Sequence, residues 1–128
     1  MKYLLDTHIL LWMIDQYEQL SPEALLILGN PENSIYFSAA NIWEVAIKSS
    51  LGRKDFDLDP HDLRSSALWA GYIELAITGK HGAAVAMLPA IHNDPFDRLL
   101  IAQAITEDIT LLTHDAAVAK YPGPILLV

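Results

Sequence analysis

Short apolar runs alternate along this chain with longer stretches in which apolar residues recur every three or four positions. An unbroken apolar run is typical of a strand buried on both faces, whereas the wider spacing indicates a helix with one buried side. The predicted strands cover residues 2–5, 35–37, 72–76, 110–113 and 125–128. The predicted helices cover residues 9–14, 22–28, 39–51, 60–69, 78–88, 95–107 and 116–120. Because helices separate the strands, we expect parallel pairing through right-handed crossovers and a three-layer α/β/α sandwich with a central parallel sheet.

Capping signals mark the starts of several predicted helices. Ser21, Asp59 and Asp94 each precede a proline. This pairing indicates a helix start, because the side chain accepts hydrogen bonds from the free N–H groups of the first turn and proline has no N–H there. Thr7 and Ser38 are expected to cap the helices that follow the first and second strands.

The composition indicates one domain with more apolar surface than a monomer of this size needs. The 128 residues contain no repeat, linker or cysteine, so thiolate catalysis, cysteine-based zinc sites and disulfides are excluded. Asp6 and Asp15 interrupt the first apolar run too early for a signal peptide or a membrane span. We therefore expect a cytoplasmic protein. Hydrophobic residues make up 52% of the chain and charged residues only 19%, which favours a homodimer or a bound partner.

The net charge of −8 gives an ambiguous signal about nucleic acid. Phosphate binding usually appears as a basic patch, and the balance here is strongly acidic. A carboxylate cluster that binds divalent cations reverses the local sign of charge, however. The charge of the whole chain therefore does not decide the question.

Four carboxylates from four segments are predicted to meet at one edge of the sheet. Asp6 and Asp115 each follow a predicted strand, and the carboxyl ends of parallel strands are where open α/β folds bind ligands. Glu44 and Asp97 lie in the first turns of helices at the same edge. Capping explains each acid singly but not their shared position. Oxygen ligands without cysteine suit Mg²⁺ or Mn²⁺, and such a site suits phosphoryl transfer.

Plainer interpretations of the neighbouring residues remain open. Glu44 and Lys48 also fit an exposed ion pair on one helix face. His8, His92 and His114 lie near the predicted acids, but the HxxxH and HExxH spacings of zinc sites are absent. These histidines better fit a role in lining the pocket or orienting carboxylates. His61 and His81 are predicted to lie on the surface.

Four sequence motifs together resemble a known family. They are LLDTHILLW at residues 4–12, SAANIWEVAIK at 38–48, HNDPFDRLLIAQA at 92–104 and LLTHD at 111–115. In this order they resemble PIN-domain proteins, and more narrowly the VapC-type ribonuclease toxins of type II toxin-antitoxin systems. The resemblance implies a single PIN-like domain over residues 1–128 and Mg²⁺- or Mn²⁺-dependent endonucleolytic cleavage of RNA through a metal-activated water.

The resemblance also assigns roles to particular residues. The predicted metal ligands and catalytic acids are Asp6, Glu44, Asp97 and Asp115, with Glu44 as a ligand or as the group that positions water. Asp94 is an additional acid that we expect to hold the helix start, while Asp97 carries the chemistry. The residues expected to support the acids are Thr7, His8 and Thr113. The residues expected to meet the RNA backbone are Lys48 and Arg98, for which solvated surface charge is an equal alternative.

The resemblance to this group also implies particular partners. They form homodimers, and a cognate antitoxin inhibits them by placing its C-terminal segment in the acidic groove. The other domain of the antitoxin binds operator DNA, so contact with DNA is expected only through the antitoxin, and no membrane is expected.

Two other functional classes are weighed against the nuclease. A receiver domain is also α/β and binds Mg²⁺, but it needs an Asp at the end of a middle strand and a Lys after the last one. The strand at residues 35–37 ends in Ser38, and no Lys follows the last strand. A non-catalytic module that offers its acidic groove to a basic peptide fits the same residues. Metal-dependent cleavage of an RNA pool separates that module from a nuclease.

Overall fold

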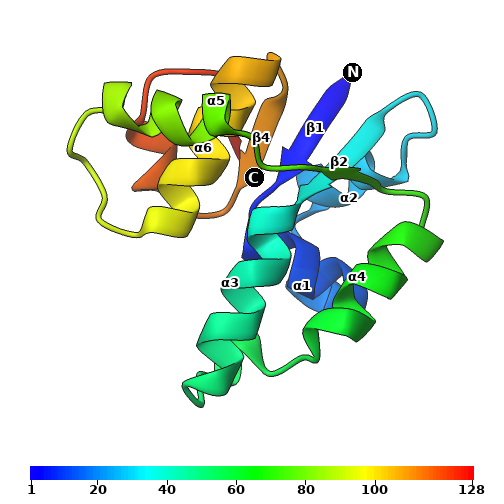
Figure 1. Ribbon diagram of the computed structural model, residues 1–128. Helices are drawn as coiled ribbons and strands as arrows, with labels where there is room; N and C mark the ends of the chain where they lie inside the picture. The colour runs from blue at the N-terminus through cyan, green and yellow to red at the C-terminus, as the bar shows by residue number, and fades with distance from the viewer.

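A five-stranded parallel sheet forms the middle of the computed structural model, which describes residues 1–128 (Figure 1). The strands, in the spatial order β3-β2-β1-β4-β5, are β1 (Lys2–Leu5), β2 (Ser34–Ser38), β3 (Ile73–Leu75), β4 (Thr110–Thr113) and β5 (Ile125–Leu127). The helices are α1 (Thr7–Asp15), α2 (Pro22–Gly29), α3 (Ala39–Ser50), α4 (Pro60–Trp69), α5 (Gly79–Ala84) and α6 (Pro95–Glu107). Figure 1 shows α1, α2 and α4 on one side of the sheet and α5 and α6 on the other. The predicted three-layer α/β/α sandwich is confirmed.

Both faces of the central strand are buried, as the unbroken apolar run predicts. Leu5 belongs to a core cluster with Leu10 of α1 and Leu63 of α4. Leu4 points to the opposite face and belongs to a second cluster with Ile101 of α6. Successive side chains of a strand point to opposite faces, so β1 contributes to both cores and fixes the residue that follows it.

Most predicted helix starts are confirmed, with one correction. The three starts marked by proline have the expected side-chain caps, and Ser38 caps α3. Thr7 was expected to cap α1, but the cap is Asp6, whose Oδ1 accepts a hydrogen bond of 2.9 Å from the Ile9 N–H. Thr7 is therefore the first helical residue, and its hydroxyl is free to reach another element.

Two predicted helices are shorter than expected. In the segment at residues 78–88, α5 ends at Ala84 and a 3₁₀ turn follows at Val85–Met87; such turns are frequent at helix ends, and Leu88 is extended because it precedes a proline. The segment at residues 116–120 forms only a 3₁₀ turn at Val118–Lys120, because so short a stretch cannot offset the cost of starting a helix. None of the six helices has the length and apolar character needed to span a bilayer.

The strand order places two of the predicted acids side by side. Strand β1 pairs with β2 on one side and with β4 on the other, so the order of the strands reverses between β1 and β4. Ligands of open α/β sheets bind at the carboxyl edge beside such a reversal. Asp6 follows β1 and Asp115 follows β4 there. A receiver domain has the order 2-1-3-4-5, so the observed order excludes that alternative.

Candidate active site

A cleft of about 210 Å³ opens at this edge of the sheet. Its lining comes from the end of β1 and the start of α1, from α3 and the segment after it, from the segment before and at the start of α6, and from the residues after β4. The lining residues are Asp6, Thr7, His8, Glu44, Lys48, Arg53, Phe56, His92, Asp94, Asp97, His114 and Asp115. The four predicted catalytic acids and Asp94 therefore share one cleft.

Three hydrogen bonds, one from α1 and two from the end of β4, hold the Asp6 carboxylate, which is 5% exposed. Its Oδ1 caps α1, and its Oδ2 accepts hydrogen bonds from the Thr113 hydroxyl at 2.6 Å and from the His114 N–H at 3.3 Å. The His114 ring nitrogen lies 3.7 Å from the same oxygen. The hydrogen bond to Asp6 raises the pKa of His114, although burial opposes the effect. Asp6 thus has a fixed orientation at the floor of the cleft.

Glu44 is 3% exposed and has a partner on each carboxylate oxygen. The Thr7 hydroxyl donates to Oε1 at 2.5 Å, and the Lys48 ammonium lies 2.5 Å from Oε2. The Glu44–Lys48 pair predicted from spacing does form, but it faces the cleft instead of the solvent. The segment that begins α6 covers this side of α3, and Asp94 of that segment lies 2.8 Å from the same ammonium.

The two acids at the start of α6 have opposite electrostatic environments. Asp94 Oδ1 accepts hydrogen bonds from the backbone N–H groups of Phe96 and Asp97, as expected of a cap. Burial raises the pKa of Asp94, but its bonds with Lys48 and with these N–H groups outweigh that effect and lower it. Burial, followed by the negative charges of Asp94 and Glu44, raises the pKa of Asp97 to about 7. His92 Nε2, 2.9 Å from Asp97 Oδ2, opposes this rise.

The donor set of the cleft fits a divalent cation. The ligand atoms of His92, Asp97 and Asp115 lie within 4.8 Å of one another, and so do those of Glu44, Asp94 and Asp97. Carboxylate oxygens are the ligands of Mg²⁺ and Mn²⁺, and imidazole is also accepted by transition metals. The raised pKa of Asp97 indicates negative charge that a cation would neutralise. Asp6 belongs to neither set, so its direct ligation of a metal stays a prediction.

Two basic residues differ from their predicted positions. Arg98 does not line the cleft, because its guanidinium donates to the backbone oxygens of Pro89 and Val85 and to the Tyr121 hydroxyl. It therefore holds the loop before α6. His81, predicted to lie on the surface, is 1% exposed. Its ring is buried because α5 packs on α6, where Nε2 lies 3.0 Å from a carboxylate oxygen of Glu107.

Three buried polar residues outside the predicted set fix the start of α3. Asn41 accepts a hydrogen bond from the Ser38 N–H and donates both to the Leu5 carbonyl oxygen and to the Thr7 hydroxyl oxygen. The Ser38 hydroxyl donates to Gln103 Oε1 at 2.5 Å. Gln103 stands in the buried run of α6, and a polar residue at an apolar position is the sequence signal that could have identified it.

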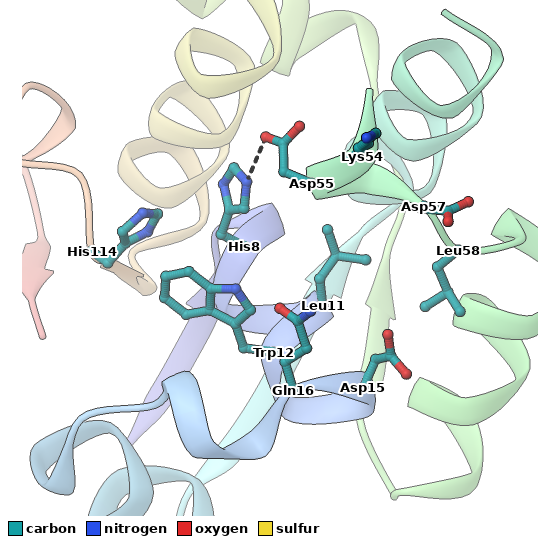
Figure 2. Close-up of a pocket in the computed structure, with 10 residues that line it drawn as sticks. All are labelled: His8, Leu11, Trp12, Asp15, Gln16, Lys54, Asp55, Asp57, Leu58 and His114. Carbon is teal, nitrogen blue, oxygen red and sulfur yellow. Dashed lines mark hydrogen bonds and ion pairs between the residues drawn. The ribbon is translucent and has the colours of Figure 1, made fainter. Parts of the chain in front are cut away.

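An aromatic pocket of about 310 Å³ adjoins the cleft (Figure 2). His8 and His114 line both hollows. The ring centres of Trp12 and His114 lie 4.5 Å apart, and those of His8 and His114 lie 5.2 Å apart. Figure 2 shows the three rings grouped together, with the His8 ring also bonded to Asp55 at 3.2 Å. Three aromatic rings, tilted against one another, thus lie directly beside the acidic residues, in a pocket that Asp15, Asp55 and Asp57 also line.

The fold and the cleft define a parallel α/β domain with an acidic site at the carboxyl edge of its sheet. The chain belongs to the PIN domain family, which matches residues 3–124. No curated protein matches the sequence significantly.

Solved structures with the same fold cover nearly the whole chain. The VapBC2 complex of Rickettsia felis, bound to a DNA fragment from its promoter, contains a chain with a TM-score of 0.68 and 20% identity, covering 100% of this chain and 98% of that one. VapBC-1 of nontypeable Haemophilus influenzae gives a TM-score of 0.55 and 17% identity, and the match covers 94% of this chain and 91% of that chain. A domain of a functionally unknown protein from Methanocaldococcus jannaschii gives a TM-score of 0.56 and 16% identity, and the match covers 99% of this chain and 90% of that chain.

Proposed function

We propose that this protein is a VapC-type toxin, a Mg²⁺- or Mn²⁺-dependent endoribonuclease built as a single PIN domain over residues 1–128. Membership of the PIN family supports a hydrolase that acts on nucleic acid. The observation that carries the proposal is the meeting of Asp6, Glu44, Asp97 and Asp115 in one cleft, where burial and the neighbouring carboxylates raise the pKa of Asp97.

The residues of the cleft divide into those that would hold an ion and those that orient them. Asp97, Asp115 and His92 would hold a divalent ion, with Asp6 beside them. When bound, the ion supplies electrophilic activation of water and of the scissile phosphate. Thr113 fixes Asp6, and Thr7 fixes Glu44 so that its carboxylate can orient the attacking water. These fixed hydrogen bonds keep the acids in place before substrate arrives.

The aromatic pocket supports single-stranded RNA as the substrate. An unpaired base can stack on a flat aromatic face, and such stacking tolerates any base. The rings of His8, Trp12 and His114 lie beside the acidic cleft, so a base stacked there would place its phosphate near the acids. A paired base in a duplex has no free face to offer, and this favours single strands.

A stripe of exposed apolar residues on α3 and at its C-cap, Leu51, supports protein partners. Trp43, Ile47 and Leu51 are 53%, 42% and 74% exposed and recur every four residues. Two of the structural neighbours come from VapBC complexes, one of them bound to promoter DNA. We infer a homodimer and a cognate antitoxin whose C-terminal segment occupies the acidic cleft, with DNA contacted only through that antitoxin. A cytoplasmic location stays a prediction.

The test is cleavage of a mixed pool of end-labelled RNA in Mn²⁺, in Mg²⁺ and in EDTA. We expect cleavage with either ion, none in EDTA, and a loss of at least about 100-fold in the Asp97→Asn variant, since a group that acts in the reaction contributes several kcal/mol. Asp62→Asn, an exposed acid in the first turn of α4, is the matched control and should cleave like the wild type.

Other outcomes of the same assay would contradict the proposal. Cleavage that persists in EDTA would rule out the metal-dependent reaction, and full cleavage by Asp97→Asn would remove that residue from it. RNA that stays intact in both ions would favour the alternative, a non-catalytic module that offers its acidic groove to a basic peptide.

A further inference from the structure

Lys48 places a positive charge inside the acidic cleft. Its Nζ lies 2.5 Å from Glu44 Oε2 and 2.8 Å from Asp94 Oδ2, and the side chain is only 14% exposed. The same atom lies 4.8 Å from the centre of the Phe56 ring and 5.5 Å from that of Phe96. Two carboxylates and two aromatic faces therefore hold the ammonium, because each attracts a cation.

The cleft contains two sets of atoms that could hold a cation, and Asp97 belongs to both. Glu44 and Asp94 complete one set, and His92 and Asp115 complete the other. Lys48 contacts two of the three carboxylates in the first set and lies in no ion pair with the second. One of the two cation positions is thus already filled by a group of the chain itself.

We propose that the Lys48 ammonium is the permanent cation of the Glu44–Asp94–Asp97 position, so that this protein binds a single exchangeable divalent ion at His92, Asp97 and Asp115. The inference rests on the proposed metal-dependent nuclease. It makes Lys48 a positioning residue that replaces a second ion and does not serve as a surface contact for the RNA backbone.

Two physical arguments support the assignment. A divalent ion placed among Glu44, Asp94 and Asp97 would meet the ammonium at close range, and two cations repel strongly in a partly buried site. To admit that ion, Lys48 would have to leave both carboxylates and both rings. At the other position, the ligand atoms of His92, Asp97 and Asp115 lie within 4.8 Å of one another, and Asp97 pairs only with the His92 ring, through a hydrogen bond of 2.9 Å that an ion would replace. No lysine or arginine would have to leave that position to admit an ion.

The experiment counts bound Mn²⁺ by the EPR signal of the free ion during titration of the whole protein. We expect one Mn²⁺ per chain in the wild type and in Lys48→Arg, which keeps the positive charge. Lys48→Met keeps the length of the side chain but removes the charge, and we expect it to bind two ions with measurable magnetic coupling between them. Two ions of similar affinity in the wild type, or a single ion in a folded Lys48→Met variant, would overturn the inference.

A second pair of variants decides which position holds the ion, even if Lys48→Met does not fold. Asp94→Asn retains a good helix cap and should keep the single Mn²⁺ with less than about a threefold change in affinity. Asp115→Asn should weaken it at least about tenfold. The reverse order would place the ion at the position assigned to Lys48 and refute the inference.

The RNA cleavage assay separates the failure of this inference from the failure of the proposed function. A protein that cleaves RNA in Mn²⁺ while binding two ions keeps the function and refutes the inference. A protein that binds one Mn²⁺ in the expected variant pattern but leaves RNA intact refutes the function and supports the inference.

Discussion

Replacing Asp97 with Asn should stabilise the metal-free protein at neutral pH, although it removes a candidate metal ligand. Burial and the charges of Asp94, Glu44 and Asp6 raise the pKa of Asp97 from 3.8 to about 7. A charged carboxylate is therefore unfavourable at this position in the folded state. Asn has nearly the same shape and no charge, so it removes the repulsion without leaving a cavity.

The raised pKa sets both the sign and the pH range of the effect. The folded protein binds the Asp97 proton more tightly than the unfolded chain, in which an Asp has a pKa of about 3.9. The contribution of Asp97 to stability should therefore be greatest below about pH 4 and should fall as the pH rises toward 7. A pKa that rises from 3.8 to about 7 corresponds to at most about 4 kcal/mol. We expect Asp97→Asn to recover about 2–4 kcal/mol at pH 7.5.

Asp94→Asn is the matched control, three residues away on the same helix start. Because Lys48 and two backbone N–H groups lower the pKa of Asp94, its charge stabilises the fold above the unfolded pKa, and this contribution is lost only in acid. Removing the charge leaves Lys48 with one carboxylate partner fewer, but it also relieves part of the repulsion on Asp97. Asp94→Asn should therefore not stabilise the protein at pH 7.5 as Asp97→Asn does, and its loss should not exceed about 3 kcal/mol, the upper value of a hydrogen bond to a charged group.

Urea unfolding followed by circular dichroism, in EDTA at pH 5.0, 6.0 and 7.5, measures these effects. The wild type should lose stability between pH 5.0 and 7.5, and Asp97→Asn should lose much less. Added Mn²⁺ should stabilise the wild type at pH 7.5 more than Asp97→Asn. The reasoning is refuted if Asp97→Asn is less stable than the wild type at pH 7.5 without metal, or if both lose stability equally with pH.

Two further predictions concern residues around the cleft. Gln103→Leu leaves the buried Ser38 hydroxyl without its acceptor. Urea unfolding should therefore show that the free energy of unfolding falls by about 1–3 kcal/mol. An unchanged free energy of unfolding would show that this contact does not hold α3. Trp12→Leu should weaken the binding of short single-stranded RNA by about 5- to 100-fold, the value of one stacked base, in fluorescence anisotropy with Mn²⁺ and a cleavage-resistant phosphorothioate RNA. Trp69→Leu, at an exposed position outside the pocket, should bind like the wild type, and equal binding by both variants would contradict base stacking in the pocket.

The fold was predictable because its elements carry local chemical signals. The start of α6 at Pro95 and its end at Glu107 follow from the Asp94–Pro95 pair and the apolar spacing, and the structure has the same bounds. Strands β1 and β4 also have the predicted bounds. The helix predicted at residues 78–88 is confirmed only as far as Ala84, because the apolar and alanine-rich spacing continues through Val85–Met87, where the backbone forms a 3₁₀ turn.

The partners of the site residues were less predictable, because they come from segments far apart in the sequence. Spacing along α3 indicates that Glu44 and Lys48 can pair, but not that Asp94, 46 residues beyond Lys48, covers them. Arg98 follows Asp97 directly, yet its side chain turns away from the cleft to the carbonyl groups of a loop. Which side of a helix becomes buried depends on tertiary packing, and one sequence does not contain that information in local form.

The start of α6 combines a stabilising acid with a destabilising one. Asp94 accepts two backbone N–H groups and pairs with Lys48, so its charge is satisfied without any metal. Asp97 lies in the first turn that Asp94 caps, but burial and neighbouring carboxylates oppose its charge. The cap keeps Asp97 in place although its ionisation works against folding. Without the Asp94 cap, the first turn of α6 would no longer hold the Asp97 carboxylate among the other acids, and the cleft would lose a ligand for a cation.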